Sequence, residues 1–221
     1  MAALASSTVV RPADHGVRRA GVWCLAGGLL GVVQAAALLA WPHQVSESMF
    51  RYPMTTGWFI TAQLSFAAQH MMLLAGVIAL LRITAVNSSR TARVAVTAAA
   101  IGVALLTVLE LVAIVAYDEA EHSSRANLLN DAYSVPVLLI GVGLVVAGFV
   151  AVRRRSMWIG ATWLPWLLLA LGVYVFVPLS WAITASFAAG RLGIGGWMVL
   201  FATLGYGLIR LDPAATSARH D

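Results

Sequence analysis

Residues 96–117, VTAAAIGVALLTVLELVAIVAY, decide the fold class of this chain. They form an apolar run that carries one ionisable side chain, Glu110. A helix needs about 20 apolar residues to cross the hydrocarbon core of a bilayer, and this run is long enough. The run therefore predicts a membrane-spanning helix with a carboxyl group inside the membrane.

The composition of the whole chain agrees with this class. Of its 221 residues, 61% are hydrophobic and 10% are charged, whereas a soluble domain is about half apolar and a quarter charged. The single cysteine, Cys24, excludes an intrachain disulfide, and neither it nor the histidines stand at the spacing of metal ligands. We therefore expect an integral membrane protein with no metal site and no cofactor.

Six segments are long and apolar enough to span a membrane, namely 20–41, 59–81, 94–117, 133–152, 164–186 and 191–210, with a short turn near Ala189 and Gly190 between the last two. The first exceeds the apolar core of a signal peptide and lacks a small-residue cleavage pattern, so we expect a retained helix. The sequence predicts an all-α polytopic membrane protein. Its six-transmembrane-helix bundle, 20–210, is one domain between tails at 1–19 and 211–221.

The arginines predict how the bundle is oriented. Eleven of the fourteen basic residues fall on the side of both termini, and three, Arg51, Arg125 and Arg191, fall on the other. Arginine-rich loops stay in the cytoplasm, so we expect both termini inside the cell and the protein in the plasma membrane. The net charge of +5 then reflects orientation and contact with anionic lipid, and we expect no nucleic-acid partner.

Polar side chains in other spans lie at the depth of Glu110. At a rise of about 1.5 Å per residue, Glu110 and Gln34 each lie roughly 10 Å below the outer boundary. Gln63 and His70, at roughly 6 and 17 Å, bracket that depth and share one helix face. Tyr174 adds a hydroxyl from the fifth span. We predict that these five side chains line one cavity that opens outwards.

The residues leave several interpretations of this polar layer open. An ionisable side chain in a span is costly and by default indicates a site. In our leading hypothesis the cavity binds a small lipophilic molecule, and Glu110 and His70 orient its polar end. In an enzyme acting on a lipid or prenyl substrate the same two residues would be the catalytic acid and base.

Other interpretations need no ligand at the layer. Polar side chains also join membrane helices, at about 0.6 kcal/mol each. Desolvation would then keep Glu110 an uncharged acid beside an uncharged His70. Two further alternatives are a proton-coupled transporter and a structural subunit of a membrane complex. The sequence also leaves the oligomeric state open.

The first outer loop is unusually apolar. The stretch 45–58, VSESMFRYPMTTGW, carries Phe50, Met54 and Trp58. We expect it to fold back over the bundle, either as a cap on the cavity or as an anchor in the lipid surface.

Two long stretches carry a resemblance to a known group of proteins. Residues 45–80, VSESMFRYPMTTGWFITAQLSFAAQHMMLLAGVIAL, and 164–208, LPWLLLALGVYVFVPLSWAITASFAAGRLGIGGWMVLFATLGYGL, cover about a third of the chain. They resemble uncharacterised six-span integral membrane proteins of high-GC Gram-positive (actinobacterial) bacteria. The resemblance implies the six-span topology and no activity, and it transfers no catalytic residues.

A second similarity concerns chemistry alone. Small multi-span terpene cyclases use buried carboxylic acids to protonate a prenyl substrate, and Glu110 could take that part. The spans hold no second carboxylate, and the chain lacks the aspartate-rich diphosphate motifs of prenyltransferases.

Overall fold

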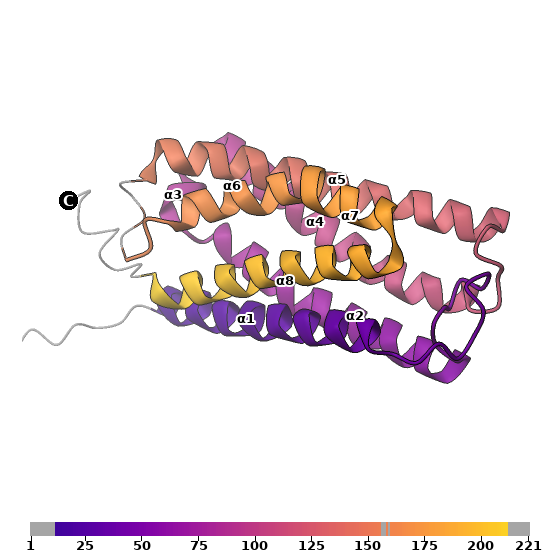
Figure 1. Ribbon diagram of the computed structural model, residues 1–221. Coiled ribbons are helices and arrows are strands. Elements are labelled where there is room, and N and C mark those ends of the chain that lie inside the picture. The colour runs from indigo at the N-terminus through magenta and orange to yellow at the C-terminus, as the bar shows by residue number, and fades with distance from the viewer. Residues whose placement is uncertain (1–11, 156–157, 159, 212–221) are drawn as a thin grey trace, which may run out of the picture.

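The structure, a computed structural model, describes residues 12–155, 158 and 160–211. They form an elongated bundle of helices (Figure 1). The elements in chain order are α1 (Pro12–Leu39), α2 (Thr56–Leu80), α3 (Thr84–Asn87), α4 (Arg90–Ala113), the 3-10 helix η1 (Ile114–Ala116), α5 (Ser124–Arg153), α6 (Leu164–Tyr174), the π-helix η3 (Val175–Leu179), α7 (Ser180–Ala185) and α8 (Phe187–Arg210).

Six of these helical units are long and apolar enough to cross a membrane. They are His15–Leu39, Thr56–Leu80, Arg90–Ala116, Ser124–Arg153, Leu164–Ala185 and Phe187–Arg210. Within the described ranges the chain forms no strand, only an isolated bridge between Met49 and Ala120. The prediction of an all-α bundle of six spans is confirmed.

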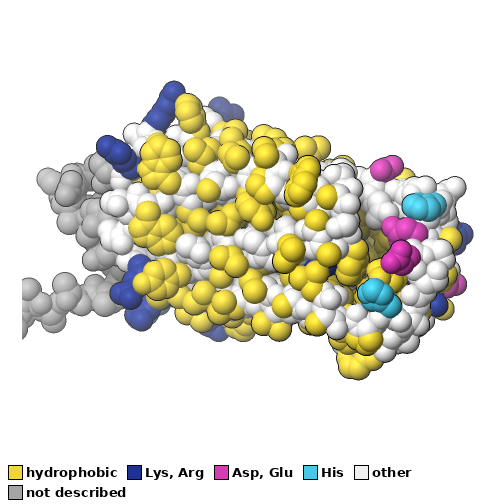
Figure 2. All heavy atoms as spheres, in the orientation of Figure 1, with side chains coloured by type: hydrophobic (Ala, Val, Ile, Leu, Met, Phe, Trp, Pro, Cys, Tyr) yellow, Lys and Arg dark blue, Asp and Glu magenta, His cyan; other side chains and the backbone are white. Residues whose placement is uncertain are grey.

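The six units pack in a ring. Each one contacts the next along the chain, in the order α1, α2, α4, α5, then α6 with α7, then α8, and α8 packs extensively against α1 to close the ring. Figure 2 shows arginines at the end where α1 begins, which we name the arginine end, and carboxylates and histidines at the opposite end, which we name the acidic end. Side chains that point into the ring from different spans can meet there away from lipid.

Two helix boundaries differ from the sequence-based prediction. Helix α5 begins at Ser124, well before the predicted start at 133, because Ser123 caps it by accepting a hydrogen bond from the Ala126 amide at 3.1 Å. Hydropathy marks where an apolar run begins, whereas the cap marks where the helix begins. Helix α5 therefore extends past the apolar run at the acidic end.

The turn between the last two spans is also displaced. It lies at Ser186, and not near Ala189 and Gly190, because Ser186 is extended and its hydroxyl accepts from the Ala189 amide at 3.1 Å. The small residues near 190 belong to the first turns of α8. As a result Arg191, predicted to lie in a loop, is part of a helix.

Small residues let neighbouring helices approach closely. A Cβ on Gly28 of α1 would lie 2.7 Å from the Cα of Ala202 of α8. A Cβ on Gly143 of α5 would lie 2.5 Å from the carbonyl oxygen of Ala95 of α4. Such close backbone approach is a common way for membrane helices to pack, since lipid offers no hydrophobic force between them.

Candidate functional site

The buried polar side chains of the acidic half form a group inside the ring, which we name the core cluster. It consists of His70 on α2, Glu110 on α4 and Tyr133 on α5. The Tyr133 hydroxyl donates to Oε2 of Glu110 at 3.2 Å. Nδ1 of His70 lies 3.9 Å from Oε1 of Glu110, too far for a hydrogen bond, and has no other partner. The structure thus brings together two of the predicted residues and adds a phenol.

Arg191 of α8 joins the core cluster from the far side of the ring. It is half-buried, its guanidinium lies 4.9 Å from the centre of the Phe187 ring, and it is near enough to Glu110 and Tyr133 for a through-space electrostatic interaction with both. An arginine stays charged at any ordinary pH. Glu110 therefore has an oppositely charged group within electrostatic reach, although the two do not form a direct ion pair.

Tyr133 and Arg191 were not among the residues predicted from sequence. The sequence predicts Tyr133 at the very start of a span and Arg191 in an outer loop. Both errors follow from the two misplaced helix boundaries. The capping serines Ser123 and Ser186 extend α5 well ahead of Tyr133 and place Arg191 inside α8.

A loop closes the ring above the core cluster. Residues 41–55, which we name the cap loop, bond to the segment after η1: the Phe50 amide donates to the Glu119 carbonyl at 3.1 Å, and the Arg51 guanidinium donates to the Tyr117 carbonyl at 2.9 Å. Phe50 packs against Phe59 of α2, and both Phe50 and Tyr133 pack against the small apolar cluster of Ala113, Ala116 and Leu129. The prediction that this loop folds back over the bundle is confirmed.

Gln63 lies between the cap loop and His70. It is 7% exposed, and its Oε1 is buried without a hydrogen-bond partner. It stands two turns from His70 on the same face of α2, as the sequence spacing indicates. Two buried polar atoms on this face of α2, Gln63 Oε1 and His70 Nδ1, therefore have no hydrogen-bond partner.

Gln34 lies elsewhere, at the seam between α1 and α2. Its Nε2 donates to the Ser65 hydroxyl at 2.7 Å, and its Oε1 is buried without a partner. Ser65 and His70 are five residues apart, which turns them about 140° from each other around α2. Gln34 is thus separated from Glu110 and His70, although it lies at a similar depth.

A hollow at this seam, which we name the α1–α2 cleft, has a volume of about 170 Å³. Two of its aromatic side chains, Trp41 and Trp58, meet edge to face with ring centres 5.2 Å apart. Met54 of the cap loop is 5% exposed and lines the cleft as well. The full lining is Gln34, Ala37, Leu38, Trp41, Met54, Trp58, Thr61, Ala62, Ser65 and Phe66. The cleft is mainly apolar, and its polar side chains are those of Gln34, Thr61 and Ser65.

Tyr174, the fifth predicted residue, belongs to neither group. It ends α6, and its hydroxyl lies against Gly196 of α8. Its ring packs against the main hydrophobic core. Among the residues that the structure describes, no group of three histidine, cysteine or acidic side chains could hold a metal ion.

Comparisons with protein-family models, with curated proteins and with solved structures found no match for this chain. The resemblance of 45–80 and 164–208 to six-span membrane proteins of high-GC Gram-positive bacteria therefore stays a prediction.

Proposed function

We propose that this multi-pass membrane protein binds a small lipophilic molecule that carries a hydroxyl group, and that the polar end of this molecule enters the α1–α2 cleft. One observation carries the proposal: Oε1 of Gln34 is buried beside the cleft without a hydrogen-bond partner. A buried polar group left unpaired costs about 1–3 kcal/mol. A ligand hydroxyl that donates to Gln34 removes this cost, so binding is favoured.

The shape of the cleft sets the size of what enters it. Ligand pockets that enclose a whole drug-sized molecule usually measure about 300–1,000 Å³, and the cleft measures about 170 Å³. Only a ring or a short branched unit fits, so the remainder of the ligand stays in lipid. Trp58 and Thr61 on the cleft wall are exposed on the bundle surface, which leaves a sideways entrance from the bilayer.

A direct test uses a photoactivatable aliphatic alcohol added to the detergent-purified protein. We expect cross-links within residues 34–66 and expect Gln34→Leu to reduce them several-fold, because leucine removes the buried acceptor. Gln63→Leu is the matched control, since it makes the same glutamine-to-leucine change at a residue of α2 that does not line the cleft. Labelling that survives Gln34→Leu but disappears in Gln63→Leu would move the ligand to the core cluster and contradict the proposal.

The core cluster favours a second candidate function, acid–base chemistry on a lipid or prenyl substrate. Glu110 could donate a proton and His70 could accept one, since Nδ1 of His70 has no partner and lies 3.9 Å from the carboxyl group. Such a substrate has to pass beneath the cap loop to reach Glu110. The test is Glu110→Gln, which should leave a well-folded protein with no turnover of a prenyl substrate.

We further propose that the arginine end lies on the cytoplasmic side of the cell membrane and the acidic end on its outer side. The separation of charge between the two ends supports this orientation (Figure 2). The native Cys24 is buried, so single cysteines introduced at the exposed residues Asn87 and His122 can be labelled separately.

In intact cells an impermeant maleimide should label His122→Cys and should label Asn87→Cys only after the membrane is permeabilised. Immunoblotting with a mass-tagged reagent measures the labelling of each variant before and after permeabilisation. The opposite pattern would invert the orientation and place the α1–α2 cleft in the cytoplasmic leaflet.

A further inference from the structure

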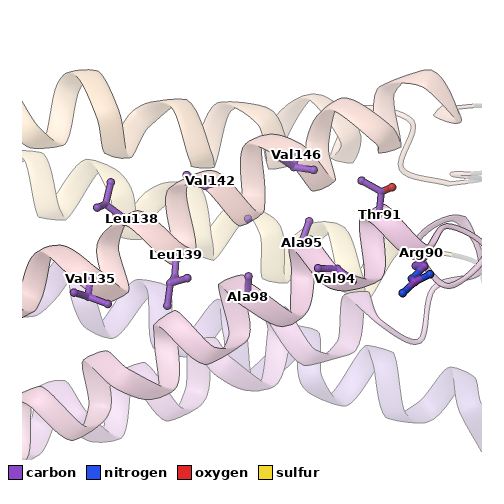
Figure 3. A pocket seen from close by; sticks show the side chains of 11 residues that line it. Arg90, Thr91, Val94, Ala95, Ala98, Val135, Leu138, Leu139, Val142 and Val146 are labelled. Atoms are coloured by element: carbon purple, nitrogen blue, oxygen red, sulfur yellow. The ribbon is translucent and has the colours of Figure 1, made fainter.

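A second hollow lies on the lipid-facing side of the bundle, between α4 and α5. This α4–α5 groove has a volume of about 750 Å³ (Figure 3). Its lining consists of Arg90, Thr91, Val94, Ala95, Ala98, Val135, Leu138, Leu139, Val142, Gly143 and Val146. None of the residues of the core cluster or of the α1–α2 cleft belongs to it, so it is a separate site.

Small residues create the groove and larger ones border it. Ala95, Ala98 and Gly143 have little or no side chain and form its floor. Val94 and Val142 border it and are 62% and 52% exposed. The lining of α5 from Val135 to Val146 rises roughly 16 Å along the helix. The groove is therefore open and mainly apolar, and it is long enough for much of an acyl chain to lie along it.

The groove has one charged end. Arg90, the first residue of α4, lines it there and is exposed (Figure 3). Arg153 lies at the same end of α5, seven residues beyond Val146 and thus on the same helix face. It is exposed, and its guanidinium lies 4.2 Å from the centre of the Phe149 ring.

A hydrogen bond holds the two helix ends together. Arg154 at the end of α5 donates to the Ser88 hydroxyl, just before α4, at 2.7 Å. Neither Arg90 nor Arg153 forms an ion pair with a described carboxylate. Two guanidinium groups, one of them stacked on Phe149, therefore lie at this end of the groove without an ion-pair partner among the described residues.

We propose that the α4–α5 groove binds an anionic glycerophospholipid, with one acyl chain along the groove and the phosphate between Arg90 and Arg153. Guanidinium groups bind phosphate oxygens in a planar, two-bond geometry. The lipid headgroups of the leaflet on this side of the bilayer lie at the arginine end. A net negative headgroup gains further from the two positive charges, so phosphatidylglycerol should bind better than phosphatidylcholine.

Native mass spectrometry of the purified full-length protein tests this with added phosphatidylglycerol and phosphatidylcholine. The wild-type chain should retain phosphatidylglycerol preferentially. Arg90→Gln with Arg153→Gln should weaken its retention about tenfold. Arg210→Gln is the matched control: this arginine lies at the same end but on α8, stacked on Tyr206, and its loss should change little.

A second variant tests the apolar part of the site. Ala98→Leu places a larger side chain on the floor of the groove and should reduce retention of both lipids. The proposal is overturned if Arg210→Gln weakens retention as much as the double variant, because binding would then follow net charge alone. It is also overturned if the protein is a dimer that Ala98→Leu dissociates, because a second copy would then fill the groove.

Discussion

Replacing Glu110 by glutamine is expected to lower the free energy of unfolding by about 2 kcal/mol. Removing one partner of a directly bonded buried charge pair costs about 3–5 kcal/mol, and Arg191 acts on Glu110 without a direct ion pair, so the loss should be smaller. Glutamine can still accept the hydrogen bond of Tyr133. The effect therefore reports mainly the charge of Arg191 left without its counter-charge.

A double-mutant cycle with Arg191→Gln isolates this coupling. Unfolding of the two single variants and of the double variant is followed in detergent by circular dichroism. We expect the double variant to lose less stability than the two single losses added together, since each single change removes the same interaction. Strict additivity would show that Arg191 and Glu110 do not interact. A fully stable Glu110→Gln protein without activity would favour the acid–base candidate instead.

Gly28→Ala is expected to destabilise the bundle by about 1–3 kcal/mol, the usual cost of overpacking a tight contact. The added Cβ would lie 2.7 Å from the Cα of Ala202, and a backbone atom cannot move aside without separating α1 from α8. Because these two helices close the ring, the change should also lower the yield of folded protein. The melting temperature in detergent measures the effect.

Gly57→Ala provides the matched control for this prediction. A Cβ on Gly57, in the first turn of α2, meets nothing within 4 Å. Alanine is favoured over glycine in a helix by roughly 0.5–1 kcal/mol, so this variant should melt at the same temperature or slightly higher. Equal destabilisation by both changes would mean that close packing of α1 on α8 does not limit stability.

The sequence predicts the spans well because each one is a continuous apolar run. Hydropathy alone places all six, and more polar loops separate most of them. The ends of α5 and α8 are less predictable because they depend on hydrogen bonds of Ser123 and Ser186. Those bonds involve single hydroxyl groups that hydropathy does not weigh.

The candidate site is predictable only in part, for a geometric reason. Depth along the helix axis correctly suggests that His70 and Glu110 can meet, since a helix rises evenly. Depth does not show which way a side chain points around the axis. Depth alone therefore groups Gln34 with them, whereas Gln34 bonds to Ser65 on another side of α2. The direction of a helix face becomes known only when its neighbours in the ring are known.

The central claim is that a lipophilic hydroxyl compound binds in the α1–α2 cleft through Gln34. Mass spectrometry of small molecules that co-purify from the native membrane tests it most directly, with wild-type, Gln34→Leu and Glu110→Gln proteins compared. We predict one reproducible lipophile that accompanies the wild-type and Glu110→Gln proteins and is lost from Gln34→Leu. A lipophile that stays with Gln34→Leu and is lost from Glu110→Gln would contradict the claim and place binding in the core cluster.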